Sequence, residues 1–214
     1  MAGATFRIAG LYAIADSGIL APDVLVSAAG AALRGGAQVL QYRDKHNEPA
    51  QRLATARALQ ELCQQYDVPL IINDDFLLAA AVGAAGVHLG RDDADISTAR
   101  AALGANAVIG LSCYNQLQRA LAAQAAGAEY VAFGSFFASR TKPQAVPATL
   151  ELLHKARAAL QIPIVAIGGI TTKNGAALIE AGADALAVID AVFNQADIRS
   201  SAERFARLFV RITT

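Results

Sequence analysis

The sequence is poor in cysteine and has no excess of charge of either sign. Cys63 and Cys113 are the two cysteines in 214 residues, and they lie far apart, without the close spacing of a metal or redox motif. We therefore expect free thiols in a reducing compartment. Eighteen basic residues balance eighteen acidic ones, and no stripe of Lys and Arg with interleaved aromatic residues is present. Nucleic-acid binding is not expected.

Long apolar runs are also absent from the sequence. No run reaches the roughly 20 residues of a membrane-spanning helix, and the stretch from Met1 to Arg7 has no apolar signal-peptide core. We expect no membrane association and a cytoplasmic location. Hydrophobic residues make up 55% of the chain, but much of this share is alanine, which indicates tightly packed helices.

No linker rich in proline, glycine or serine divides the chain, so we expect a single domain over residues 1–214. Short apolar runs alternate with alanine-rich segments of helical periodicity, such as Pro49–Gln65 and Asn115–Ala126. This alternation is typical of an α/β protein and predicts a single (β/α)₈ TIM barrel, with a doubly wound sheet as the alternative. The expected strands are 11–15, 39–42, 70–72, 87–89, 108–111, 130–133, 164–167 and 185–189.

An internal repeat favours the closed barrel. Pro69 and Pro163 introduce the third and seventh strands in similar sequences, so elements four apart look alike, as two half-barrels would. A glycine precedes each even-numbered strand, and we expect these glycines to end helices in the left-handed conformation. They are Gly36, Gly86, Gly127 and Gly182.

Polar residues follow the third and fourth strands directly. In barrels of this kind the active site lies at the carboxyl ends of the strands. Asp75 is interpreted as the N-cap of the next helix, which leaves Asn73 and Asp74 for function. Asp92 and Asp93 come just after the neighbouring strand. Carboxylates at these two adjacent strand ends predict a shared Mg²⁺ site that also takes phosphate oxygens. His88, between two apolar residues, is interpreted as a structural, hydrogen-bonded histidine.

The second strand ends in a cationic segment. Strand alternation places Gln41, Arg43 and Lys45 on one side, and their donors suit phosphate oxygens; a solvated charged loop is the alternative. At the fifth strand, Ser112 has no triad partners and is predicted to hydrogen-bond substrate. At the first strand, Tyr12 is interpreted as a core residue and Asp16 as the start of a turn.

The last strand ends suggest a lid and an anion site. A long loop from Gly134 to Pro147 follows the sixth strand, and a loop of this length favours a functional lid. Gly168 and Gly169 follow the seventh strand and precede a helix, so their amides can approach an anion. With the end of strand eight, this is the usual phosphate position of the fold. The polar residues within the loop are Ser139, Arg140, Thr141 and Lys142.

Taken together, these motifs resemble the thiamine-phosphate synthase family, and the resemblance covers nearly the whole chain. The motifs in question are Gln41-x-Arg43-x-Lys45, Asn73-Asp74, Gly86-Val-His-Leu-Gly-x-x-Asp93, Gly110-x-Ser112, Thr141-Lys142 and Gly168-Gly-Ile-Thr171. The resemblance implies a transferase that joins hydroxymethylpyrimidine pyrophosphate to a thiazole phosphate and releases pyrophosphate. Its partners are then phosphorylated small molecules, and a homodimer is an open possibility for its assembly.

The resemblance also implies a role for each site residue. Mg²⁺ would be held by Asp74 and Asp93, and Arg43, Ser112 and Lys142 would act in catalysis. The pyrimidine pyrophosphate would contact Gln41, Tyr42, Arg43, Asp44, Lys45, Asn73, Ser112 and Lys142. The thiazole phosphate would contact Ser139, Arg140, Thr141, Gly168, Gly169, Ile189 and Asp190.

Two positions depart from the family pattern. The loop has Ala138-Ser139 where Pro-Thr is common, and Asp190 stands where Ser is common; we expect the Asp190 side chain to turn away and cap locally. Two other functions are consistent with the barrel. One is a thiazole tautomerase, which needs no pyrophosphate cluster, and the other is a non-catalytic phospholigand-binding barrel.

Overall fold

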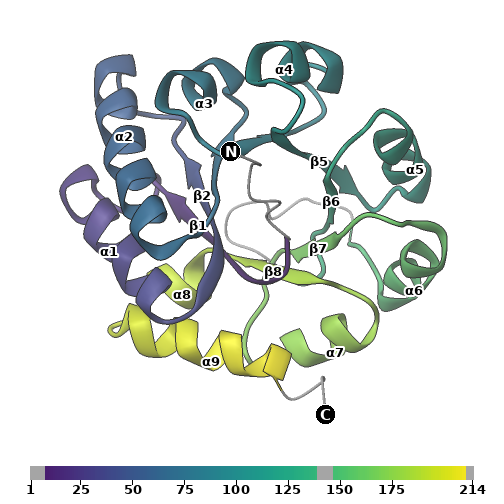
Figure 1. Cartoon of the computed structure of the whole chain (residues 1–214). Helices are drawn as coiled ribbons and strands as arrows, with labels where there is room; N and C mark the ends of the chain where they lie inside the picture. Colours follow the sequence, from purple (N-terminus) through teal and green to yellow (C-terminus); the bar gives the residue numbers. More distant parts are fainter. Residues whose placement is uncertain (1–7, 139–146, 211–214) are drawn as a thin grey trace.

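The computed structural model describes residues 8–138 and 147–210, which form a ring of parallel strands surrounded by helices (Figure 1). The strands pair in sequence order and close into a barrel, because β8 pairs with β1 through Gly10 and Ala185. The predicted TIM barrel is confirmed. The strands are β1 (Gly10–Asp16), β2 (Ala37–Arg43), β3 (Leu70–Asn73), β4 (Gly86–Leu89), β5 (Val108–Tyr114), β6 (Tyr130–Phe133), β7 (Ile164–Ile167) and β8 (Ala185–Val188).

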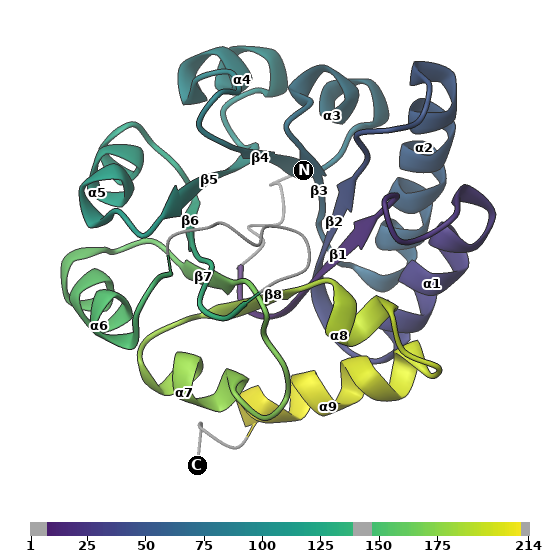
Figure 2. The ribbon, with the colours of Figure 1, turned by 180° about the vertical axis from the view of Figure 1, so that it is seen from behind.

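Helices follow every strand and cover the outside of the barrel, as the view from the other end also shows (Figure 2). A short extra helix, α8, comes directly after β8 and packs against α9. None of the helices among the described residues is long and apolar enough to span a membrane. The helices are α1 (Pro22–Arg34), α2 (Pro49–Tyr66), α3 (Phe76–Val82), α4 (Ile96–Leu103), α5 (Leu117–Ala125), α6 (Leu150–Ala159), α7 (Gly175–Glu180), α8 (Asp190–Phe193) and α9 (Ile198–Val210).

Two hydrophobic cores result from the alternation of side chains along the strands. Outward-facing residues such as Leu40 and Ile72 pack under the helices. Inward-facing residues fill the barrel, where Ile71 and Val165 lie beside two buried tyrosines, Tyr12 and Tyr130. Because both faces of each strand are buried, the strands read as nearly continuous apolar runs, and that is why their positions could be predicted.

Three of the four glycines expected to end helices in the left-handed conformation do so, and the expectation for the fourth is wrong. Gly36, Gly127 and Gly182 have φ values of 91°, 88° and 111°. Gly86 does not end a helix; it lies within β4, where a Cβ atom would come 1.7 Å from the Val108 carbonyl oxygen. The left-handed residue that ends α3 is Gly83, with φ 67°. Close packing against β5, rather than a helix end, requires glycine at position 86.

Cys63 and Cys113 are both free and buried, as expected from their spacing. Burial raises the pKa of each thiol to about 12. Neither thiol is ionised near neutral pH, so both behave as small apolar side chains. The single-domain organisation of residues 1–214 stays a prediction.

Candidate active site

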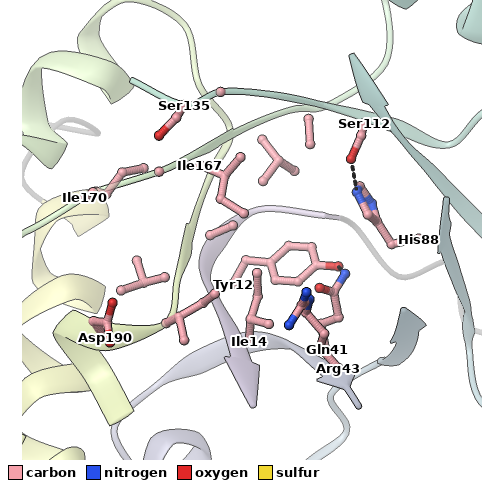
Figure 3. Close-up of a pocket in the computed structure, with 18 of the residues that line it drawn as sticks. Tyr12, Ile14, Gln41, Arg43, His88, Ser112, Ser135, Ile167, Ile170 and Asp190 are labelled. Carbon is pink, nitrogen blue, oxygen red and sulfur yellow. Dashed lines mark hydrogen bonds between the residues drawn. The ribbon is translucent and has the colours of Figure 1, made fainter. Parts of the chain in front are cut away.

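A cavity of about 390 Å³ opens where the strands end. Residues from all eight strands line it. The aliphatic part of the wall comes from β1, β6, β7 and β8, and polar groups gather at two ends (Figure 3). Gln41, Arg43 and Ser112 lie at one end, and Ser135 and Asp190 lie at the other, with Ile14 and Ile167 between them. The predicted site residues that line the cavity are Gln41, Arg43, Asn73, Ser112, Gly168, Gly169, Ile189 and Asp190.

The cation Arg43 is held by a carboxylate inside the barrel mouth. Its Nη1 atom lies 2.6 Å from Oδ2 of Asp16, whose side chain is 4% exposed. The other carboxylate oxygen of Asp16 accepts a hydrogen bond from the Gly18 amide. Asp16 therefore does start a turn, as expected, but it also orients the guanidinium, a role that the sequence pattern did not indicate.

Lys45 lies beyond the end of β2 and does not line the cavity; its ammonium group contacts Oδ2 of Asp74 at 2.9 Å. Asp74 has a positive φ of 64°, a conformation that aspartate tolerates better than most residues. Its amide donates to the His88 carbonyl oxygen, which ties the end of β3 to β4. The backbone thus brings Asp74 to the loop that carries Asp93.

Asp74 lies close enough to Asp93 to affect the ionisation of Asp93. Burial raises the pKa of Asp93 and the neighbouring Asp74 carboxylate raises it further, while the Gly90 amide and Lys45 act in the opposite direction. No group of three or more His, Cys, Asp or Glu side chains suited to a metal exists among the described residues. Mg²⁺ commonly binds one or two carboxylates and completes its shell with substrate phosphates and water. This crowded pair therefore fits such an ion.

Two predicted contacts, Tyr42 and Asp44, have side chains that the structure does not bring to the cavity. Strand alternation turns Tyr42 outward, opposite to Gln41 and Arg43, and its side chain is buried under the helices. Its hydroxyl donates to Asp44, which also accepts from the amides of His46 and Asn47. Burial opposes ionisation of Asp44, but these hydrogen bonds outweigh it and hold its pKa well below the ordinary value. The two residues stabilise the loop that carries Lys45.

The cavity floor contains polar residues whose role the sequence pattern did not reveal. Tyr12 is a core residue, as expected, but it also lines the cavity. Tyr130 was predicted only as part of a strand. Burial raises the pKa of both phenols well above the ordinary value. His88 is hydrogen-bonded, as predicted. Its ring nitrogens contact the hydroxyls of Tyr130 and Ser112. Tyrosines that face into the barrel could have indicated these polar contacts, because a buried phenol needs a polar partner.

The opposite end of the cavity is made of backbone. Gly168 and Gly169 have φ values of 105° and 62°, and a Cβ atom on Gly169 would come 2.5 Å from the Ala138 carbonyl oxygen. The helix after these glycines, α7, begins only at Gly175, whereas α8 begins at Asp190, on the cavity wall. The amino end of α8 therefore lies at the cavity wall. The expected anion site, at Gly168-Gly169 together with the end of strand eight, stays a prediction.

We expected the Asp190 side chain to cap α8, and this expectation is wrong. The N-cap of this helix is Ile189, and no side-chain capping hydrogen bond is formed there within the described chain. Asp190 instead lines the cavity (Figure 3). Asp75 does cap α3, through a hydrogen bond from the Leu78 amide. The remaining predicted contacts, Ser139, Arg140, Thr141 and Lys142, lie outside the described residues.

Comparison with known proteins finds similar chains that match over nearly the whole length. The sequence profile of the family described as "Thiamine monophosphate synthase" matches residues 11–192. The chain is 55% identical over 202 residues to thiamine-phosphate synthase of Nitrosococcus oceani, covering 94% of this chain and 93% of that one. It is 50% identical to the Acidithiobacillus ferrooxidans protein of the same name, covering 98% of each chain. The solved thiamine phosphate pyrophosphorylase of Pyrococcus furiosus superposes with a TM-score of 0.86, at 33% identity and 98% coverage of both chains.

Proposed function

The chain belongs to the thiamine monophosphate synthase family, and from that premise we propose how its cavity holds two phosphorylated substrates. The enzyme is a transferase of thiamine biosynthesis with thiamine-phosphate synthase activity. The observation that carries the proposal is the division of the cavity into two polar ends with an apolar wall between them. Hydroxymethylpyrimidine pyrophosphate binds at the Gln41 and Arg43 end, and thiazole phosphate binds at the Gly168 and Asp190 end.

In the reaction, the thiazole nitrogen forms a bond to the pyrimidine methylene carbon, and the bond from that carbon to the pyrophosphate oxygen breaks. Both electrons of the broken bond leave with pyrophosphate, so negative charge grows on its oxygens while the methylene becomes cation-like. No protein nucleophile is needed. Holding the two substrates in line across the apolar wall supplies proximity that is worth roughly 7 kcal/mol or more.

Arg43 and Lys45 are proposed to contact the pyrophosphate. Arg43 is already oriented by Asp16, so its remaining N–H groups can donate to phosphate oxygens without a large change in the side chain. Such preorganised charge is worth most where negative charge develops. Asn73 and Ser112 line the same end and are proposed to hydrogen-bond the pyrimidine pyrophosphate, with Ser112 donating to it.

Asp74 and Asp93 are proposed to hold Mg²⁺ at the rim of this end. When bound, the ion would supply positive charge to the leaving pyrophosphate. Lys45 forms an ion pair with Asp74, so this end of the cavity already brings a cation next to the carboxylates. The Lys45 side chain is 51% exposed, so its ammonium group can turn from the carboxylate to a phosphate when substrate arrives.

Among the described residues, the thiazole phosphate is proposed to bind to backbone amides. The first amides of α8 have no intrahelical acceptor, and the positive φ values of Gly168 and Gly169 bring the main chain close to the ligand. Ser139, Arg140 and Thr141 are assigned to the same phosphate, and Lys142 to the leaving group, by resemblance to the family; these roles stay predictions. Lys142→Ala should lower turnover by a factor on the order of 10², the scale of a lost transition-state donor.

We also propose a cytoplasmic enzyme that acts without nucleic acid or membrane. Two other functions remain as competitors. A thiazole tautomerase would turn over thiazole substrate alone, and a binding barrel would turn over neither substrate. Thiamine phosphate and pyrophosphate should form in equal amounts only when both substrates and Mg²⁺ are present. Conversion of thiazole substrate without the pyrimidine would contradict the proposal.

A further inference from the structure

A continuous chain of hydrogen bonds crosses the floor of the cavity from Gln41 to Ser112. Nε2 of Gln41 lies 2.9 Å from the Tyr12 hydroxyl, which lies 2.8 Å from the Tyr130 hydroxyl. The Tyr130 hydroxyl lies 2.9 Å from Nδ1 of His88, and Nε2 of His88 lies 2.9 Å from the Ser112 hydroxyl. The members come from β2, β1, β6, β4 and β5. The two ends of the chain, Gln41 and Ser112, both line the cavity.

The middle of this chain is enclosed by the barrel. Tyr12 is 1% exposed and Tyr130 is fully buried, and the Tyr130 ring stacks on His88 with centroids 5.6 Å apart. A Cβ atom at Gly110 would come within 1.9 Å of the Tyr130 ring, so the ring fits because β5 has glycine at that position. In such a site a hydroxyl hydrogen without an acceptor costs about 1–3 kcal/mol. The chain must therefore use every donor it contains.

That requirement links the direction of each hydrogen bond to the next. Because the Gln41 amide nitrogen donates to Tyr12, the Tyr12 hydrogen points to Tyr130, its other hydrogen-bonding neighbour among the described residues. The Tyr130 hydrogen then points to Nδ1 of His88, which leaves the ring hydrogen on Nε2. That hydrogen is donated to Ser112, so the Ser112 O–H is free to donate into the cavity.

The reverse order is the other self-consistent arrangement. If the Gln41 amide turns so that its oxygen faces Tyr12, each hydroxyl reverses, the His88 hydrogen moves to Nδ1, and Ser112 becomes an acceptor towards the cavity. We propose that this chain makes the hydrogen-bonding character of Gln41 and Ser112 interdependent, so that the cavity offers an acceptor at Gln41 together with a donor at Ser112, or the opposite pair, but not a mixture.

This inference rests on the proposed function, because it assigns the chain to recognition of the pyrimidine substrate. An aminopyrimidine presents an amino donor, and its ring nitrogens and phosphate oxygens are acceptors. The order that follows from donation by the Gln41 amide nitrogen to Tyr12 matches this substrate. The Gln41 amide oxygen then accepts from the amino group, and Ser112 donates to a ring nitrogen or a phosphate oxygen. Tyr12, Tyr130 and His88 are then positioning residues for specificity. A pyrimidine with an oxo group in place of the amino group would require the reversed order at Gln41.

The position of the His88 hydrogen tests the chain without any substrate. Long-range ¹H–¹⁵N NMR spectra of the parent protein at pH 8 should show the neutral ring with its hydrogen on Nε2. In Gln41→Glu the carboxylate can only accept, so the Tyr12 hydroxyl must donate to it and the whole order reverses. We expect the hydrogen to move to Nδ1 although the substitution lies three hydrogen bonds from the histidine ring. A parent ring that carries hydrogen on Nδ1 overturns the assigned order even if the variant fails to fold.

Two controls isolate the route. With Tyr130→Phe as the background, the His88 spectrum should be the same whether residue 41 is Gln or Glu. Tyr42→Phe also removes a buried tyrosine hydroxyl, but one bonded to Asp44 outside the chain, and it should leave the His88 spectrum unchanged. An unchanged Nε2–H ring in Gln41→Glu, or a ring with hydrogen on both nitrogens, overturns the proposal.

Kinetics then connect the chain with recognition. Gln41→Met and Ser112→Ala should each lower kcat/KM for the pyrimidine pyrophosphate. If the two residues acted independently, the factor by which kcat/KM falls in the double variant would be the product of the two single factors. We expect a fall about tenfold smaller than that product, which is within the usual range for coupled residues. In the Tyr130→Phe background the losses should multiply. Independent losses in the parent background overturn the coupling. If neither single variant changes kcat/KM for the pyrimidine pyrophosphate, the proposed binding of this substrate at Gln41 and Ser112 is wrong. The NMR experiment still tests the hydrogen-bond chain, because it uses no substrate.

Discussion

Asp16 and Arg43 form an ion pair at the carboxyl ends of adjacent strands, with 2.6 Å between Oδ2 and Nη1 and side chains that are 4% and 22% exposed. The pair joins β1 to β2 at the cavity, and the Ser17 amide also donates to the Arg43 carbonyl oxygen. The arginine expected to bind pyrophosphate is thus held in place before substrate arrives. Such preorganisation reduces the ordering cost of binding.

Asp16→Asn should lower stability and weaken pyrophosphate binding. Removing one partner of a buried ion pair costs about 3–5 kcal/mol, and because Arg43 is partly exposed we expect about 1–3 kcal/mol. The KM for the pyrimidine pyrophosphate should rise more than that for the thiazole phosphate. Urea unfolding and steady-state kinetics measure both effects. As a control, Glu151→Gln removes the exposed pair with Lys155 and should change neither quantity. Equal KM values in parent and Asp16→Asn would contradict a positioning role.

Asp93→Asn should stabilise the Mg²⁺-free protein near pH 7 and abolish the stabilisation that Mg²⁺ gives to the parent. Burial and the neighbouring Asp74 raise the pKa of Asp93 in the folded state, so the folded protein binds more protons than the unfolded chain between the two pKa values. The parent therefore loses stability as the pH rises through that window, and the penalty persists above it. The amide carries no such penalty.

Thermal unfolding at several pH values, with and without Mg²⁺, measures this difference. Without metal, the variant should melt higher by roughly 1–3 °C at pH 7, and the advantage should disappear below the ordinary aspartate range near pH 4. Both Asp74→Ala and Asp93→Ala should raise the Mg²⁺ concentration needed for half-maximal turnover. Parent-like Mg²⁺ titrations for both variants would show that the two carboxylates do not share the ion.

Gly169→Ala should cost more stability than Gly83→Ala and should also impair catalysis. The two glycines have similar φ values, 62° and 67°, so both substitutions carry a left-handed penalty of about 1–2 kcal/mol. At Gly83 a Cβ atom meets no described atom within 4 Å, whereas at Gly169 it would come 2.5 Å from the Ala138 carbonyl oxygen. The difference between the variants therefore isolates close packing beside the cavity.

Denaturant unfolding and the KM for thiazole phosphate measure the two effects. Gly83→Ala should keep the parent KM, because α3 ends on the surface away from the cavity. Gly169→Ala should raise it several-fold, since the amides beside Gly169 must move to relieve the contact. Equal KM values would mean that these amides do not bind the phosphate.

The sequence predicted the barrel well because its strands are buried on both faces and bounded by proline and glycine; the bounds of β6 and β7 agree with the expected ones to the residue. Alternation along β2 also correctly placed Gln41 and Arg43 on the same side of the strand, which faces the cavity, whereas Tyr42 between them faces the helices. The role of Gly86 was misjudged because a glycine before a strand can serve either a helix end or close strand packing. That distinction depends on Val108, which is distant in sequence.

The hydrogen-bond chain could not be predicted for a similar reason. Tyr12 and Tyr130 are 118 residues apart, and each alone looks like a large core side chain. Their contact depends on how β1 and β6, two strands that are not neighbours, are placed in the closed barrel. The ion pair of Asp16 with Arg43 was likewise hidden, because an aspartate at a strand end also suits a simple turn, a role that Asp16 fills as well.

Asp190→Ser should keep the fold and bind thiazole phosphate more tightly than the parent. Asp190 is the first residue of α8 and lines the cavity, and its side chain forms no capping hydrogen bond within the described chain. Its carboxylate interacts favourably with the amino end of the helix, but it also brings negative charge to the place proposed for a phosphate. A serine hydroxyl removes that repulsion and can donate to the phosphate.

The KM for thiazole phosphate at equal Mg²⁺ concentration should fall about two- to tenfold in Asp190→Ser, which corresponds to roughly 0.4–1.4 kcal/mol. Asp190→Asn keeps the size of the side chain and removes only its charge, so it should shift the KM in the same direction. Because charge repulsion is screened by salt, the difference between parent and variants should shrink as ionic strength rises. A higher KM in both variants would mean that Asp190 assists the ligand, through a neighbouring cation or a bound metal ion, and that the phosphate does not lie against the carboxylate.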